Sequence, residues 1–288
     1  MRLRLALRVR RGMGVRSGEH RVPGRTGTEG IEIGGHRSYA PGDDLRHLDW
    51  NAFGRLDQLV VRRFTAERAA AVHLLLDASA SMGVPARDRK LATASALAET
   101  LGAIALATGD SVRVAPLGGA PGARLGPTLR GRGMLMRLRT LLAAVTPGGT
   151  VAVGAALAAY ARTQPRPGIA IVLSDFTGEP DELVAGILAL RARRYDVVLL
   201  HVVGPGELDP SREFSSGVLR DVESGETHPM RLTRALRARY AGILEEHLTA
   251  LRAVAERTGA AYARIVAGTP ALEAVSGELV RLGIVRRR

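Results

Sequence analysis

The stretch AVHLLLDASASMG, residues 71–83, decides the fold because it joins a continuous apolar run to a turn rich in hydroxyl groups. The run 71–77 has the length of one strand and no regular alternation, which is typical of a strand covered by helices on both faces. Asp77 closes the run, and Ser79 and Ser81 follow at alternate positions. Alternate side chains of an extended segment point the same way, so these three can converge on one point.

Strands and helices alternate after residue 70, which predicts an α/β fold with a mostly parallel central sheet and helices on both faces. The apolar run GIAIVLSD at 168–175 repeats the design of the first strand and also closes on an aspartate, Asp175. Further strands are expected at 111–117, 196–203 and 261–266. Helices are expected at 87–108, 132–145, 151–162 and 181–193, from 232 to Gly259, and at 270–282.

The longest predicted helix carries its apolar residues on one face, and we expect this stripe to belong to the core. Residues 217–230 before it are expected to form a hairpin turning at Ser224 and Gly225, because a short polar pair with glycine separates two extended pieces. The stripe consists of Leu232, Leu236, Tyr240, Ile243, Leu244, Leu248, Leu251 and Val254.

The composition before residue 70 is rich in glycine and arginine, unlike the remainder. We therefore expect an N-terminal accessory region with extended or β structure at 1–69, followed by the α/β domain at 70–288. One extended piece is expected at 56–64. Trp50, the only tryptophan, is expected to anchor this region by packing it onto the α/β domain, with contact to a partner as the lesser alternative. The Pro-Gly-Asp-Asp sequence at 41–44 is expected to be a turn rather than a second metal site.

The overall composition limits the possible functions. The chain has 288 residues, enough for one large α/β domain and an accessory region, and it has no cysteine, which excludes disulfides and thiolate metal sites. Its net charge of +13 favours an acidic partner. Binding of nucleic acid is a weaker alternative, because arginines are spread over nearly every segment, Lys90 is the only lysine, and aromatic residues are only 3%.

No signal peptide or transmembrane segment is expected. The N-terminal sequence MRLRLALRVRRGMG is interrupted by arginine too often for a signal-peptide core. The uncharged stretch 140–161 has the length of a membrane span, but Pro147, Gly148 and Gly149 at its middle predict two short helices joined by a loop. We therefore expect a cytoplasmic protein.

Oxygen-bearing side chains follow two predicted strands at the sheet edge where α/β proteins bind ligands. Asp77 and Asp175 supply carboxylates, Ser79 and Ser81 supply hydroxyl groups, and Thr150, which ends a TPGGT loop just before a helix, can add another. Aspartate and serine after a strand are also common in turns and helix caps. Because Mg²⁺ prefers oxygen ligands, the five residues together predict a site for Mg²⁺ or Mn²⁺.

The same motifs resemble those of known families. DASAS at 77–81, GGT at 148–150 and SD at 174–175 resemble the metal-ion-dependent adhesion site of von Willebrand factor A domains. Upstream, HRSYAPGDDLRHLDW at 36–50 and LVVRRFTAE at 59–67 resemble the signature of the bacterial family named domain of unknown function 58. Together the two resemblances cover most of the chain.

The resemblance implies a von Willebrand factor A-like, Rossmann-like domain that binds partners and is not an enzyme. Its metal ion would take the last ligand from an acidic side chain of a partner protein. The resemblance also implies a MoxR-type AAA+ ATPase as a partner and a role in chaperone-like assembly or maturation of other proteins.

Two enzymatic alternatives remain open. A phosphatase of the haloacid-dehalogenase type also places an aspartate nucleophile after an apolar strand. It needs a second aspartate two positions later, where this chain has Ser79, and a lysine further downstream, whereas the second half of this chain contains no lysine. A hydrolase with a serine nucleophile would need a positioned base. His73 lies inside the first strand and is expected to be a core residue.

Overall fold

The structure is a computed structural model of the chain. It describes residues 5–7, 31–41, 43, 45, 48–66, 70–118, 125–163, 166–212, 215–221 and 225–287. These residues fall into two compact units, with a boundary at Ala70. The short strand β1 (Leu5–Leu7) belongs to the larger unit, because it pairs antiparallel with β12 (Val285–Arg287). Residues 5–7 therefore belong to the α/β unit and not to the accessory region expected at 1–69.

The larger unit is built on a six-stranded sheet with the order β11-β8-β7-β4-β5-β6. Five strands are parallel, and β6 adds an antiparallel edge that the sequence did not predict. The predicted α/β class with a mostly parallel central sheet is therefore confirmed. The strands are β4 (Ala71–Asp77), β5 (Ser111–Leu117), β6 (Leu129–Arg130), β7 (Ile169–Ser174), β8 (Asp196–Val203) and β11 (Ala261–Val266).

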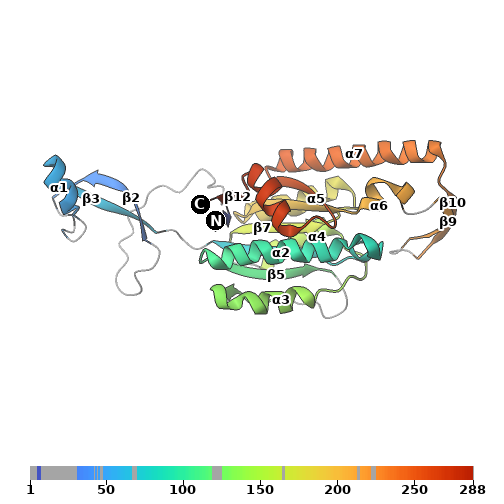
Figure 1. Cartoon of the computed structure of the whole chain (residues 1–288), viewed down its shortest axis with the longest axis horizontal. Helices are drawn as coiled ribbons and strands as arrows, with labels where there is room; N and C mark the ends of the chain where they lie inside the picture. Colours follow the sequence, from blue (N-terminus) through green and yellow to red (C-terminus); the bar gives the residue numbers. More distant parts are fainter. Residues whose placement is uncertain are drawn as a thin grey trace. The chain divides into compact units, whose positions relative to one another are not determined.

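Helices cover both faces of this sheet, as predicted (Figure 1). Successive residues of β4 point to opposite faces, so Leu74 packs in one core and Leu75 in the other. The first core is covered by α2 (Lys90–Ala107), α3 (Leu135–Ala143) and α8 (Ala271–Ala274) with the π-helical turn that follows it, Val275–Leu279. The second is covered by α4 (Val153–Thr163), α5 (Pro180–Ala192) and α7 (Arg234–Thr258).

The strand order reverses between β4 and β7. From β4 the chain crosses to β5 on one side and later returns to β7 on the other. The two strands pair up to Leu76 opposite Leu173, so Asp77 and Ser174 lie at the same edge of the sheet. Ligands of open α/β sheets bind at such a reversal.

The first half of α7 departs from the predicted core stripe. Leu248 and Leu251 are buried, but Ile243 is 54% exposed and the stripe residues before Leu248 are at most half-buried. The prediction that the whole stripe belongs to the core is therefore wrong. Periodicity identifies an apolar face of a helix but not what lies opposite it. This half of α7 runs toward the hairpin of β9 (Ser216–Arg220) and β10 (Thr227–Arg231) (Figure 1).

The predicted hairpin is present as β9 (Ser216–Arg220) and β10 (Thr227–Arg231), paired antiparallel. Its turn includes Gly225, which has a positive φ of 78°. Ser224 lies outside the described residues. Nearly all side chains of both strands are exposed.

The smaller unit contains the antiparallel pair β2 (Ile31–Ser38) and β3 (Val60–Ala66) and the helix α1 (Trp50–Leu56). The extended piece predicted at 56–64 begins only at Val60. Trp50 is 63% exposed, and its expected packing onto the larger unit stays a prediction. At the predicted turn, the amide of Asp43 donates to the carbonyl of Ala40; Gly42 and Asp44 are outside the described residues.

The uncharged stretch 140–161 forms the end of α3, a loop and most of α4, as predicted. One helix in the described ranges is long and apolar enough to cross a membrane by length and composition alone. It spans Ala86–Ala107 and includes α2, and 50% of its most apolar window is buried inside the protein.

Candidate metal centre

The turn that follows β4 gathers three of the predicted ligands. Asp77 is buried, and its Oδ1 accepts a hydrogen bond from the amide of Ser79 at 2.9 Å. Its Oδ2 accepts one from the hydroxyl of Ser174 at the end of β7. The hydroxyl oxygens of Ser79 and Ser81 lie 2.9 Å apart. Asp77, Ser79 and Ser81 are therefore close neighbours, as the alternating spacing predicts.

The loop of Thr150 is joined to this turn through its backbone. The amide of Ala80 donates to the carbonyl of Gly149 at 2.9 Å, and the amide of Gly148 donates to the carbonyl of Ala78 at 2.8 Å. Thr150 itself is exposed. The structure thus places the backbone of the Thr150 loop beside the turn, with the side chain of Thr150 exposed to solvent.

Asp175 follows β7 and is 3% exposed. Its Oδ2 accepts a hydrogen bond from the ammonium group of Lys90 at 2.8 Å, while its Oδ1 is buried without a hydrogen-bond partner. The next residue, Phe176, has a positive φ of 45°, and its carbonyl oxygen lies 2.8 Å from Nε2 of His247. An unpaired buried carboxylate oxygen is costly, so Oδ1 marks a position where a ligand would compensate.

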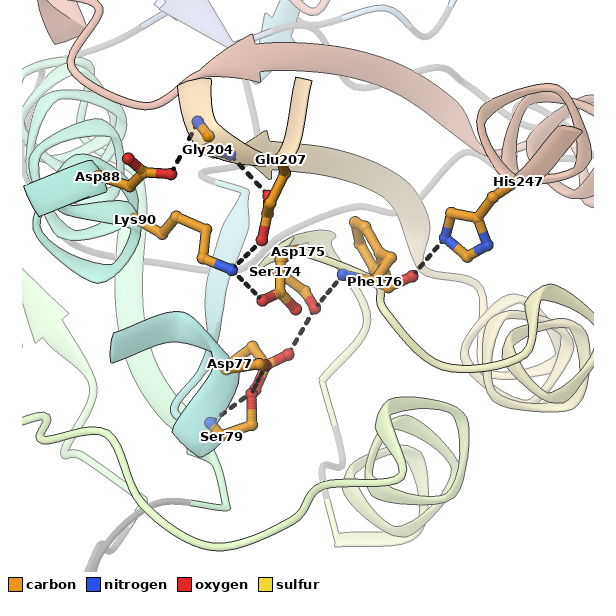
Figure 2. Close-up of polar contacts among 12 residues, drawn as sticks. Asp77, Ser79, Asp88, Lys90, Ser174, Asp175, Phe176, Gly204, Glu207 and His247 are labelled. Carbon is orange, nitrogen blue, oxygen red and sulfur yellow. Dashed lines mark hydrogen bonds and ion pairs between the residues drawn. The ribbon is translucent and has the colours of Figure 1, made fainter. Parts of the chain in front are cut away.

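Lys90, the first residue of α2, is 2% exposed and contacts two carboxylates (Figure 2). Besides Asp175, its ammonium group is paired with Glu207 of α6 (Pro205–Leu208). Glu207 also accepts a hydrogen bond from the amide of Gly204 at 2.7 Å. Sequence reasoning missed both Lys90 and Glu207 as parts of this site. The one available signal was that Lys90 is the only lysine in an arginine-rich chain.

The electrostatics of the site favour an added cation. Burial raises the pKa of Asp77, because its ionised form loses solvation, although hydrogen bonds from Ser174 and Ser79 oppose the shift and the nearby charge of Asp175 adds to it. Burial alone would lower the pKa of Lys90, but the carboxylates of Asp175 and Glu207 outweigh it and raise that pKa. A dication would offset the buried negative charge that Lys90 leaves uncompensated.

The donor set fits a hard divalent cation. The two carboxylates, the neighbouring hydroxyl groups of Ser79 and Ser81, and the hydroxyl group of Thr150 on the adjoining loop are oxygen ligands of the kind that Mg²⁺ and Mn²⁺ accept together with water. In the part of the chain that the structure describes, no three His, Cys, Asp or Glu side chains gather as a metal site. An ion at this edge would therefore depend on the hydroxyl groups as well as on Asp77 and Asp175.

Comparisons with known proteins bear on both units. The model of the family described as "Protein of unknown function DUF58" matches residues 35–250. A Mycobacterium tuberculosis protein, named Uncharacterized protein Rv1480, is 32% identical over 246 residues, which cover 81% of this chain and 73% of that protein.

Solved structures also show similarity. The conserved hypothetical protein BatB from Bacteroides thetaiotaomicron superposes with a TM-score of 0.47 at 19% identity, over 75% of this chain and 99% of that one. The von Willebrand factor type A protein from Catenulispora acidiphila superposes with a TM-score of 0.37 at 21% identity, over 51% of this chain and 36% of that one.

Proposed function

The chain belongs to the DUF58 family of proteins of unknown function, and on that premise we propose that its α/β domain is a metal-dependent module for binding other proteins. In this proposal Mg²⁺ or Mn²⁺ is held by Asp77, Ser79, Ser81, Thr150 and Asp175. The bound cation supplies an electrophilic point that accepts a carboxylate oxygen from a partner.

One observation carries the proposal: the donor set has a buried side and an open side. Asp77 and Asp175 are 1% and 3% exposed, and Oδ1 of Asp175 has no hydrogen-bond partner. Ser81 is half-buried and Thr150 is exposed. A cation between them would be held from the sheet side and would be reachable from solvent, which suits a ligand supplied by another protein.

Several features favour binding over turnover. His73, the histidine within β4, is buried with Nδ1 2.7 Å from the hydroxyl of Tyr160, and burial lowers its pKa to about 4, with Arg113 contributing. This is the environment of a core residue rather than of a base for Ser79. The ammonium group of Lys90 is buried between two carboxylates, so it is not available to a phosphate group.

We further propose a cytoplasmic role with a MoxR-type AAA+ ATPase, in chaperone-like assembly or maturation of other proteins. The family resemblance suggests this partner, and the net charge of +13 would favour acidic surfaces.

The test is retention of a purified MoxR-type ATPase on the immobilised chain, in Mg²⁺ and in chelator. We expect retention in Mg²⁺ and loss of most of it in chelator. Asp77→Asn should fail in both conditions, whereas Asp181→Asn, the same change at an 88% exposed side chain, should behave as wild type. Equal retention with and without Mg²⁺ would contradict the proposal.

The enzymatic alternative gives a different result in a second assay. We expect the purified chain with Mg²⁺ to leave a generic phosphate ester intact. Metal-dependent hydrolysis that Asp77→Asn abolishes would replace the binding function with a phosphatase.

A further inference from the structure

Lys90 occupies an unusual place for a lysine. Its side chain is 2% exposed, and its ammonium group lies 2.8 Å from Oδ2 of Asp175 and is also paired with Oε1 of Glu207 (Figure 2). Every other basic residue of the chain except histidine is an arginine. An ammonium group is a compact point charge, which suits a site that also has to leave room for a second cation.

The two oxygens of Asp175 have different surroundings. Oδ2 holds the ammonium group of Lys90, whereas Oδ1 is buried and has no hydrogen-bond partner. We propose that Lys90 is a resident cation of this centre, which shares Asp175 with the bound metal, lowers the affinity for that metal and keeps it exchangeable. This inference rests on the metal site of the proposed function.

Coulomb repulsion gives the direction of the effect. An ammonium group and a dication bound to one carboxylate lie close enough that their repulsion is substantial even at the high effective dielectric of a protein. Lys90 also neutralises part of the negative charge of Asp175, which would otherwise attract the metal. A metal ion whose charge is only partly neutralised by its ligands stays electrophilic. The pairing of Lys90 with Asp175 therefore favours binding of an additional carboxylate from a partner.

Lys90 has the opposite effect on the metal-free protein. Asp77, Asp175 and Glu207 are carboxylates in or at the edge of the buried site, and Lys90 is paired with two of them. Removing one partner of a buried ion pair strongly destabilises a protein, because the other charge stays buried. Lys90 therefore stabilises the fold without metal and weakens metal binding, whereas a purely structural lysine would support both.

The test is Lys90→Met, which keeps most of the aliphatic side chain and removes the charge. Mn²⁺ affinity is measured by electron paramagnetic resonance of free Mn²⁺, and thermal unfolding is measured with and without Mn²⁺. We expect Mn²⁺ to bind at least about tenfold more tightly than to wild type. We also expect a lower melting temperature without metal and a larger rise when Mn²⁺ is added.

Arg139→Gln is the matched control, because Arg139 is a half-exposed cation paired with Glu99 on the surface. It should leave Mn²⁺ affinity unchanged. Weaker or unchanged Mn²⁺ binding by Lys90→Met would overturn the inference. Absence of Mn²⁺ binding in wild type would instead refute the metal site itself, so the two failures are distinguishable.

If Lys90→Met does not fold even in excess Mn²⁺, the variant Glu207→Gln tests the effect of Lys90 on metal affinity instead. This change removes a negative charge and leaves the ammonium group of Lys90 to Asp175 alone. We expect Mn²⁺ affinity to fall by about threefold or more. An affinity equal to that of wild type would overturn the inference.

Discussion

Asp77→Asn should abolish the binding of Mg²⁺ and Mn²⁺. The substitution removes one of the two carboxylates of the site and changes the size of the side chain very little. Mg²⁺ is commonly held through one or two carboxylates with water. After the change only Asp175 remains, and because Lys90 already neutralises part of its charge, too little attraction is left to dehydrate the ion. Calorimetric titration should therefore give measurable heats for the wild type and only heats of dilution for the variant.

The fold should survive this change. An asparagine can still accept the hydrogen bond that the amide of Ser79 donates. It also removes the cost of burying the ionised carboxylate of Asp77, a cost that shows in the pKa of this group being raised by burial. We expect similar melting temperatures without metal. Asp181→Asn, at an exposed position of α5, is the control and should bind metal as wild type does. Equal heats for Asp77→Asn and wild type would exclude Asp77 as a ligand.

Gly154→Ala should destabilise the larger unit by about 2–3 kcal/mol in the free energy of unfolding. A Cβ atom at Gly154 of α4 would lie 2.1 Å from the carbonyl oxygen of Glu182 in α5. A Cβ atom at Gly186 would likewise lie 2.3 Å from the carbonyl oxygen of Gly154. Because both contacts are with backbone, the two helices would have to separate and would open the core that they share with Leu157.

The control for this prediction is Gly242→Ala in α7, where an added Cβ atom meets nothing within 4 Å. Alanine is the better helix former, so this variant should gain up to about 1 kcal/mol. Chemical denaturation of both variants gives the comparison. If Gly154→Ala is as stable as wild type, α4 and α5 are not packed as closely as the structure shows.

The sequence predicted the parts of the fold that depend on local pattern. The continuous apolar runs of β4 and β7 identify strands covered on both faces, and each run ends on or next to an aspartate. Because the carboxyl ends of parallel strands share one edge of the sheet, Asp77 and Asp175 could be placed together before the structure was known. The DASAS spacing likewise predicted the neighbouring hydroxyl groups of Ser79 and Ser81.

Features that depend on long-range contacts were not predictable in the same way. The pairing of Lys90 with Asp175 and Glu207 joins the beginning of α2 to the segment after β7 and to α6, and no local pattern marks it. The exposure of Ile243 depends on what lies opposite the first half of α7 rather than on its periodicity. The two-residue strand β6 is too short to give a periodic signal.

The most direct measurement is an anomalous-scattering map from crystals of this protein soaked with Mn²⁺. We predict one strong peak at the carboxyl edge of β4 and β7, surrounded by the side-chain oxygens of Asp77, Ser79, Ser81, Thr150 and Asp175. A map with no peak at this edge, or with Mn²⁺ bound only elsewhere, would contradict the metal-dependent function.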